Sequence, residues 1–232
     1  MSATPAVPLT AVLFDFGGTL DSDGIPWKAR FFRLWSEEIG EVEPERFDRA
    51  FYEADDALVG NLPADLPLAA TAGRLAAGLA NGLSAGHGSA CERVASRFCE
   101  EARDHLAGSV RLLERLASRY RLAVVSNFYG NLAAVCAEAG LPPAIAAVID
   151  SASVGAEKPD PRIFEAALCA VGARPSEALF VGDSLARDMA GARALGMRHA
   201  WIAGDQKGDS PTGCCPQDTI LKRLADLEQV IA

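Results

Sequence analysis

Hydrophobic and polar positions divide the chain into two kinds of segment. Short, almost unbroken apolar runs are typical of strands buried on both faces of a parallel sheet. They lie at residues 11–14, 121–125, 147–150, 178–181 and 199–202, and a further short strand is predicted at 218–221. Helical spacing of apolar residues dominates the long stretch between the first two runs, where no strand is predicted.

Helices are predicted both in that long stretch and between the later strands. In the long stretch they begin near residues 27 and 44 and cover about 66–80 and 89–106. Further helices are predicted at 110–119, 131–140, 161–172, 185–195 and, with an amphipathic pattern, 224–231. Asp160 and Pro161 match a helix N-cap and first helical position, and Gly172 matches a helix end.

Strands that alternate with helices predict an α/β fold built on a Rossmann-like, doubly wound parallel sheet. Residues 1–20 and 110–232 form the core domain of this prediction, and residues 21–109 form an inserted helical domain.

The composition argues against some classes of binding partner. The net charge of −9 argues against unaided binding to nucleic acid or to an anionic membrane, because both require clustered Lys and Arg. The N-terminus lacks a basic region followed by an apolar run, and no segment reaches the roughly 18 unbroken apolar residues of a membrane span. We therefore expect a cytoplasmic protein that binds a small solute, as a monomer or a homodimer.

Six cysteines are scattered through the chain without a CxxC pair, so neither a zinc site nor a thioredoxin-like site is predicted. Buried thiols are the expected role for these residues. Cys214 and Cys215 lie in a segment rich in Gly and Pro and are candidates for a redox-sensitive pair.

Polar residues follow three of the predicted strands. Asp15, Ser126 and Asp183 stand at or just beyond strand ends, and Lys158 lies in a loop. Because the carboxyl ends of parallel strands share one edge of the sheet, we expect these residues to converge. Their chemistry suits phosphoryl transfer: two carboxylates for Mg²⁺, a hydroxyl for a phosphate oxygen and an ammonium group for developing charge. Asp188, five residues after Asp183, is expected to bind metal-ligated water or to orient Lys158.

The sequence resembles the haloacid dehalogenase superfamily of hydrolases in four motifs that occur in order. They are residues 13–20 (LFDFGGTL), 124–127 (VVSN), 158–159 (KP) and 181–184 (VGDS) with Asp188. The helical stretch between the first two motifs is similar to the α-helical cap of the family, and the chain resembles its phosphoglycolate phosphatase-like branch.

The resemblance implies Mg²⁺-dependent hydrolysis of a small phosphorylated metabolite through an aspartyl-phosphate. Asp15 would be the nucleophile, assisted by Ser126 and Lys158. The residues implied to hold Mg²⁺ are Asp15, Gly17 through its backbone carbonyl, Asp183 and Asp188, and those near the phosphate are Gly18, Thr19 and Asn127. The cap would close over the substrate and exclude water.

One position departs from the family's phosphatases. They carry a second aspartate two residues after the nucleophile, where this chain has Gly17. That side chain protonates the leaving oxygen, and general acid–base help is worth about a hundredfold or more in rate. Glycine spares the backbone metal contact and removes only this help.

Four interpretations of Gly17 remain open. In the first, the protein is a slow phosphatase or acts on substrates with a good leaving group. In the second, Asp21 or Asp23 replaces the missing acid. In the third, the chemistry is that of a dehalogenase, or of a phosphonatase with Lys28 as its Schiff-base lysine. In the fourth, the chain binds a phosphorylated metabolite or another protein without turnover. The acidic pair Asp183 and Asp188 argues against a metal-free dehalogenase.

Overall fold

The computed structural model describes residues 7–84, 88–204 and 219–231, so Cys214 and Cys215 lie outside the described part. Its centre is a six-stranded sheet in the order β3-β2-β1-β4-β5-β6, with every neighbouring pair parallel. The strands are β1 (Ala11–Phe14), β2 (Arg121–Ser126), β3 (Ile145–Asp150), β4 (Ala178–Gly182), β5 (Arg198–Ile202) and β6 (Thr219–Leu221). The predicted doubly wound parallel sheet is confirmed.

Helices flank this sheet and form a separate group beside it. The longer helices are α1 (Trp27–Glu38), α2 (Pro44–Asp56), α3 (Leu68–Gly82), α4 (Ser89–Ala117), α5 (Leu132–Glu138) and α7 (Pro161–Val171), and the short ones are α6 (Ser151–Val154) and α8 (Ala190–Ala194). The tight segment η1 (Phe16–Leu20), whose backbone is non-helical at Gly17 and Gly18, follows β1, and a turn of π-helix, η3 (Leu185–Met189), follows β4. The 3₁₀ turns are η2 (Pro175–Glu177) and η4 (Leu224–Gln229).

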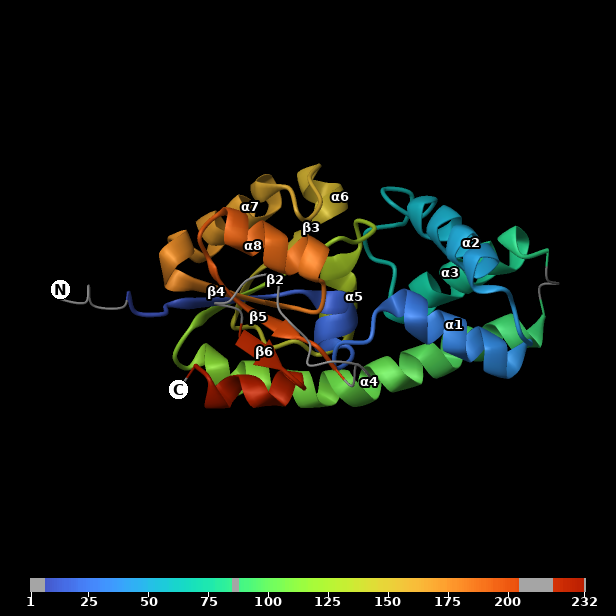
Figure 1. Ribbon diagram of the computed structural model, residues 1–232, viewed down its shortest axis with the longest axis horizontal. Coiled ribbons are helices and arrows are strands. Elements are labelled where there is room, and N and C mark those ends of the chain that lie inside the picture. Colours follow the sequence, from blue (N-terminus) through green and yellow to red (C-terminus); the bar gives the residue numbers. More distant parts are fainter. Residues whose placement is uncertain (1–6, 85–87, 205–218, 232) are drawn as a thin grey trace.

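Side chains of the central strands alternate between two apolar clusters, one on each face of the sheet. In β1, Val12 and Phe14 join the cluster that contains α4 and α5, whereas Ala11 and Leu13 join the cluster that contains α7. All four are fully buried. Figure 1 shows α7 and α8 over one face and the long α4 under the other. Burial on both faces explains why the strands read as unbroken apolar runs.

The helical group consists of α1, α2, α3 and the first half of α4, and it lies at one end of the sheet (Figure 1). The sequence prediction divided 89–119 into two helices, which is wrong, because α4 is one continuous helix of 29 residues. Its apolar face continues through Leu106, Leu112 and Leu116, and Gly108 is an exposed interior position that costs only about 1 kcal/mol.

Three smaller predictions are also corrected. The C-terminal amphipathic segment forms the 3₁₀ turn η4 rather than an α-helix, and the short α6 was not predicted. Cys91, Cys99 and Cys136 are buried as expected, but Cys169 is exposed.

Within the described residues, no helix is both long enough and apolar enough to cross a membrane.

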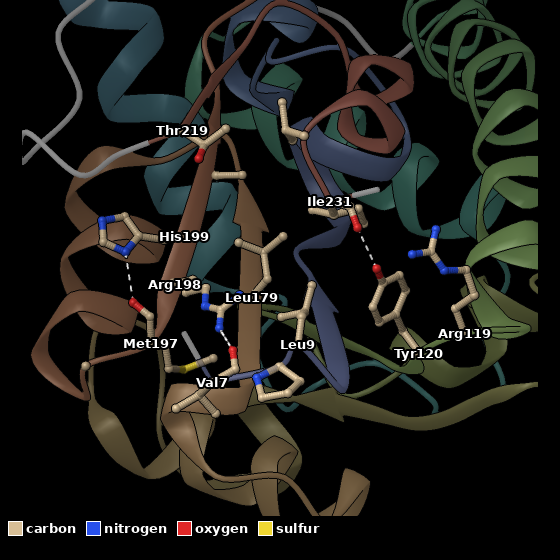
Figure 2. Close-up of a pocket in the computed structure, with 14 residues that line it drawn as sticks. Val7, Leu9, Arg119, Tyr120, Leu179, Met197, Arg198, His199, Thr219 and Ile231 are labelled. Atoms are coloured by element: carbon tan, nitrogen blue, oxygen red, sulfur yellow. Dashed lines mark hydrogen bonds between the residues drawn. The ribbon is translucent and has the colours of Figure 1, made fainter. Parts of the chain in front are cut away.

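A cavity of about 660 Å³ lies where the strands begin (Figure 2). Apolar side chains such as Leu9 and Leu179 line it together with Arg119 and Arg198, and the described residues around it include no Asp or Glu. The strand ends that carry the predicted chemistry are at the opposite edge of the sheet.

Candidate active site

A second cavity, of about 530 Å³, opens at the carboxyl edge of the sheet. Its lining includes the five residues that the sequence predicts to converge there: Asp15, Ser126, Lys158, Asp183 and Asp188. They come from the ends of β1, β2 and β4, from η3 and from the loop before α7. The helical group supplies the facing wall, so the cavity lies between the sheet and α1–α2.

The Asp15 carboxylate is held from two sides. Ser126 Oγ donates a hydrogen bond to Asp15 Oδ1 at 2.7 Å, and Lys158 Nζ lies 2.6 Å from the same oxygen. The backbone N–H of Asp15 donates to the carbonyl of Val181 in β4, which fixes the residue at the sheet edge. Asp15 is 6% exposed, so it is a buried carboxylate that still reaches the cavity.

Lys158 is fixed at both its head and its backbone. Its Nζ also lies 2.7 Å from Asp188 Oδ1. The Asn127 amide brackets its backbone, because Asn127 Oδ1 accepts from the Lys158 N–H at 2.7 Å and Asn127 Nδ2 donates to the Lys158 carbonyl at 3.1 Å. The Asn127 side chain, implied by the resemblance to lie near the phosphate, is therefore engaged in positioning Lys158.

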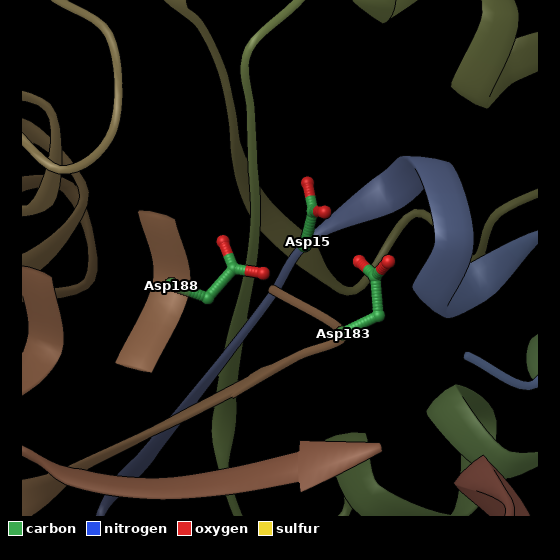
Figure 3. A group of neighbouring side chains, drawn as sticks. All are labelled: Asp15, Asp183 and Asp188. Atoms are coloured by element: carbon green, nitrogen blue, oxygen red, sulfur yellow. The ribbon is translucent and has the colours of Figure 1, made fainter. Parts of the chain in front are cut away.

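Asp15, Asp183 and Asp188 form a carboxylate cluster in which one oxygen of each lies within 4.8 Å of the others (Figure 3). Two glycines make room for it. A Cβ at Gly18 would overlap the Asp183 carboxylate, and φ of Gly18 is +90°, which favours glycine. A Cβ at Gly182 would overlap Asp188.

The electrostatics of the cluster follow from burial and from like charges. Burial raises the pKa of Asp183 well above its ordinary value, and the Asp15 and Asp188 charges raise it further. Burial also raises the pKa of Asp188 to about 6, although Lys158 opposes the shift. Burial alone lowers the pKa of Lys158, but the Asp15 and Asp188 carboxylates more than offset this, and the ammonium form is favoured.

Three carboxylates around one ammonium group leave an excess of negative charge. Carboxylate oxygens are the ligands that hard divalent cations prefer, so the donor set suits a metal ion such as Mg²⁺. Asp15, Asp183 and Asp188 are the residues that could hold it.

Two other residues implied to lie near the phosphate do not line the cavity. Thr19 is buried, and its Oγ1 donates to Asp183 Oδ1 at 3.4 Å. Gly18 is buried beside Asp183, and its N–H donates to Asp21 Oδ1 at 2.7 Å. Both residues thus shape the loop that holds Asp15.

Gly17 lines the cavity, and Trp27 covers it. A Cβ at Gly17 would lie 3.1 Å from Trp27 Nε1, closer than most such contacts. The indole is fixed, because Nε1 donates to Asp21 Oδ2 at 2.7 Å and the ring packs edge-on against Phe98 and Phe128. An aromatic ring therefore occupies the space beside the position where phosphatases of this kind carry an acid.

Neither replacement acid suggested by the sequence reaches the cavity. Asp21 is fully buried and pairs with Arg30, whose Nη1 lies 2.8 Å from Asp21 Oδ2. Asp23 accepts a hydrogen bond from the Leu224 N–H and faces a separate surface hollow with His105. The expectation that one of them substitutes for Gly17's missing side chain has no support in this geometry.

Several residues of the site were missed from sequence. Arg30 lies one helical turn from Trp27 on the buried face of α1. An arginine at that helical spacing is the sequence pattern that could have identified it. Trp201 Nε1 donates to the Asp183 carbonyl at 2.9 Å, and Asp55 and Tyr129 line the cavity together. These contacts join residues far apart in the chain and leave no local pattern.

The fold and this site define a Rossmann-like protein with a buried carboxylate at the carboxyl edge of its sheet. A family model described as haloacid dehalogenase-like hydrolase matches residues 9–196. The chain belongs to this family, as its four motifs predicted.

Individual relatives add detail. The chain is 44% identical over 92 residues to the phosphoserine phosphatase of Thermus thermophilus, a match that covers 40% of this chain and only 35% of that protein. It resembles the crystal structure of a HAD phosphatase from Thermococcus onnurineus (TM-score 0.59, 22% identity, 97% and 98% of the two chains). It also resembles the L-2-haloacid dehalogenase from Xanthobacter autotrophicus (TM-score 0.62, 20% identity, 96% and 98%). At these identities the two structures show a shared fold.

Proposed function

We propose that this protein is a metal-dependent phosphatase of small phosphomonoesters, with Asp15 as its nucleophile. The observation that carries the proposal is the buried Asp15 carboxylate, held by Ser126 and Lys158 beside Asp183 and Asp188. A carboxylate can attack phosphorus only if its repulsion from the phosphate is offset. Lys158 supplies one positive charge beside the Asp15 carboxylate. The similarity to a phosphoserine phosphatase supports phosphate ester hydrolysis as the reaction.

The roles of the side chains follow from their contacts. Asp15 forms a bond to phosphorus, and the ester oxygen leaves. Lys158 balances charge on the transferring phosphoryl group, and Asn127 and Asp188 keep Lys158 in place. Ser126 orients Asp15 and offers its hydroxyl to a phosphate oxygen. When bound by the aspartates, Mg²⁺ supplies positive charge to the phosphate oxygens.

We assign the cap role to residues 21–109 within this proposal, with residues 1–20 and 110–232 as the core. Trp27, Phe51 and Tyr52 of α1 and α2 face Asp15 across the cavity. Helices in that place exclude water from the reaction and contact the leaving group. The boundary near residue 110 falls within α4, which spans both parts.

A phosphonatase would need a Schiff-base lysine in the cavity, and Lys28 does not suit that role. Lys28 lines the cavity, but its Nζ pairs with Asp48 at 2.7 Å. Burial is the largest single influence on the pKa of Lys28 and lowers it, but the contacts with Asp48 and Tyr52 together raise it more, so the net shift is upward. A Schiff-base lysine needs a lowered pKa to be nucleophilic at neutral pH.

Phosphate release from a panel of phosphorylated metabolites, with Mg²⁺ and with EDTA, tests the proposal. We expect release that depends on the metal and is fastest for acyl, aryl or anomeric phosphates, whose leaving groups need little protonation. Absence of release across the panel, or halide release from 2-haloacids without metal, would refute a phosphatase.

Mg²⁺ is also expected to stabilise the protein without any turnover. A ligand at about 100 times its Kd adds about 2.7 kcal/mol to the free energy of unfolding. Asp183→Asn removes one donor and one like charge, so it should abolish this gain while stabilising the metal-free form. Urea denaturation with Mg²⁺ and with EDTA measures both effects. An equal Mg²⁺ gain in wild type and variant would place the metal elsewhere.

A further inference from the structure

Asp55 contributes a fourth carboxyl to the active-site cavity. Among the described residues that line this cavity, Asp55 is the one Asp or Glu outside the cluster of Asp15, Asp183 and Asp188. It lies in the last turn of α2 and is partly exposed. The helical group therefore places an acid on the wall that faces the nucleophile.

Contacts connect Asp55 to the nucleophile loop. Tyr129 OH donates to Asp55 Oδ1 at 2.5 Å, and Tyr129 lies three residues after Ser126, which holds Asp15. The Tyr129 ring packs against Trp27 with centroids 6.3 Å apart, and Trp27 covers Gly17. One chain of contacts thus runs from Asp55 to the position that lacks an acid.

The surroundings of Asp55 favour its protonated form. Burial raises its pKa, the hydrogen bond from Tyr129 lowers it, the neighbouring Asp56 raises it and Arg187 of η3 lowers it, with a net upward shift. Burial and the adjacent Asp55 raise the pKa of Tyr129 well above its ordinary value, so the phenol remains a donor. A carboxyl group with a raised pKa is what general acid catalysis at neutral pH requires.

We propose that Asp55 is the general acid and base of this enzyme, supplied by the helical group in place of the side chain absent at Gly17. The inference rests on the proposed phosphatase function and deepens it. Gly17 makes the replacement necessary, the commitment of Asp21 and Asp23 elsewhere removes the other candidates, and the shared cavity provides access.

The proton balance is complete with these groups. In the first step Asp15 forms a P–O bond, the bond from phosphorus to the ester oxygen breaks, and the Asp55 proton passes to that oxygen, which leaves as an alcohol. In the second step water attacks the aspartyl-phosphate and gives a proton to the Asp55 carboxylate. The bond from Asp15 to phosphorus then breaks, inorganic phosphate leaves, and both aspartates return to their starting forms.

The test compares Asp55→Asn with Asp56→Asn on two esters, p-nitrophenyl phosphate and glycerol 2-phosphate. Nitrophenolate leaves without a proton, whereas an alkoxide needs one. Asp55→Asn should therefore lower kcat/KM, which reports on formation of the aspartyl-phosphate alone, by about 100-fold or more for glycerol 2-phosphate and by less than about tenfold for p-nitrophenyl phosphate. Asp56 is exposed and lies outside the cavity, so Asp56→Asn is the matched control: it removes only one of the smaller influences on the Asp55 pKa and should change either rate by far less than Asp55→Asn does.

A second variant separates chemistry from folding. Asp55→Glu keeps the carboxyl and should recover part of the glycerol 2-phosphate activity, and thermal melting reports the stability of each variant. Equal losses of kcat/KM on both esters, or no loss on either, would overturn the role of Asp55 alone. If wild type releases phosphate from neither ester in Mg²⁺, nor from any metabolite of the panel, the proposed function itself fails, and the role of Asp55 with it.

Discussion

Asp15→Asn should abolish metal-dependent phosphate release while leaving the fold intact. The amide is not a nucleophile, and losing a nucleophile removes the whole chemical route, so we expect at least about a 10⁴-fold fall in kcat. Asn retains one oxygen that can accept the hydrogen bond from Ser126. Steady-state phosphate release measures the loss, and circular dichroism checks the fold.

Asp160→Asn is a suitable control for this experiment. Asp160 caps α7, accepts from the Arg162 N–H and does not line the cavity. Its substitution should cost some stability and leave kcat unchanged. Retained turnover in Asp15→Asn would show that another group attacks phosphorus.

Asp21→Ala should cause a large loss of stability. The substitution removes the nearer carboxylate from the Arg30 guanidinium, which is 3% exposed and keeps Glu101 at 3.6 Å, and it leaves Trp27 Nε1 and the Gly18 N–H without an acceptor. Breaking a buried ion pair from one side typically costs about 3–5 kcal/mol. Urea denaturation measures the free energy of unfolding directly.

Asp23→Ala is the control for Asp21→Ala. The Asp23 side chain is partly exposed, and it contacts His105 and the Leu224 N–H at the surface. We expect it to cost about 1 kcal/mol or less. Similar costs for the two alanine variants would contradict the structural role of Asp21. A selective fall in turnover of Asp23→Ala on alkyl phosphates would restore it as a candidate acid.

Much of the fold could be predicted because parallel strands buried on both faces leave a strong local pattern. The four apolar residues before Asp15 and the N-cap at Asp160 are examples, and both match the structure. The break assigned near residue 108 failed because a single exposed glycine weakens a helix without ending it, and the packing of α4 against other elements decides its length.

The same reasoning explains which parts of the site were found. Asp15, Ser126, Lys158 and Asp183 could be placed together because topology brings strand ends to one edge. The direction of each side chain could not be deduced. Tertiary hydrogen bonds turn the Asn127 amide to the Lys158 backbone.

The opposite wall of the cavity is the least predictable part. Trp27 of α1, Asp55 of α2 and Tyr129 of the loop after β2 come from three segments whose relative placement depends on helix packing. Asp21 and Asp23 stand close to Gly17 in sequence and were therefore the natural candidates, but proximity along the chain does not place them in the cavity. No sequence pattern marks Asp55, although the structure places it in the cavity.

Identification of a phosphorylated intermediate would test the role of Asp15 most directly. The enzyme would be mixed with a substrate from the panel and Mg²⁺, quenched in acid during turnover, digested and mapped by mass spectrometry. We predict one phosphoryl group on Asp15, labile to hydroxylamine and absent from Asp15→Asn. Turnover accompanied by a phosphoryl group on another residue, with Asp15 unmodified, would contradict the proposed chemistry.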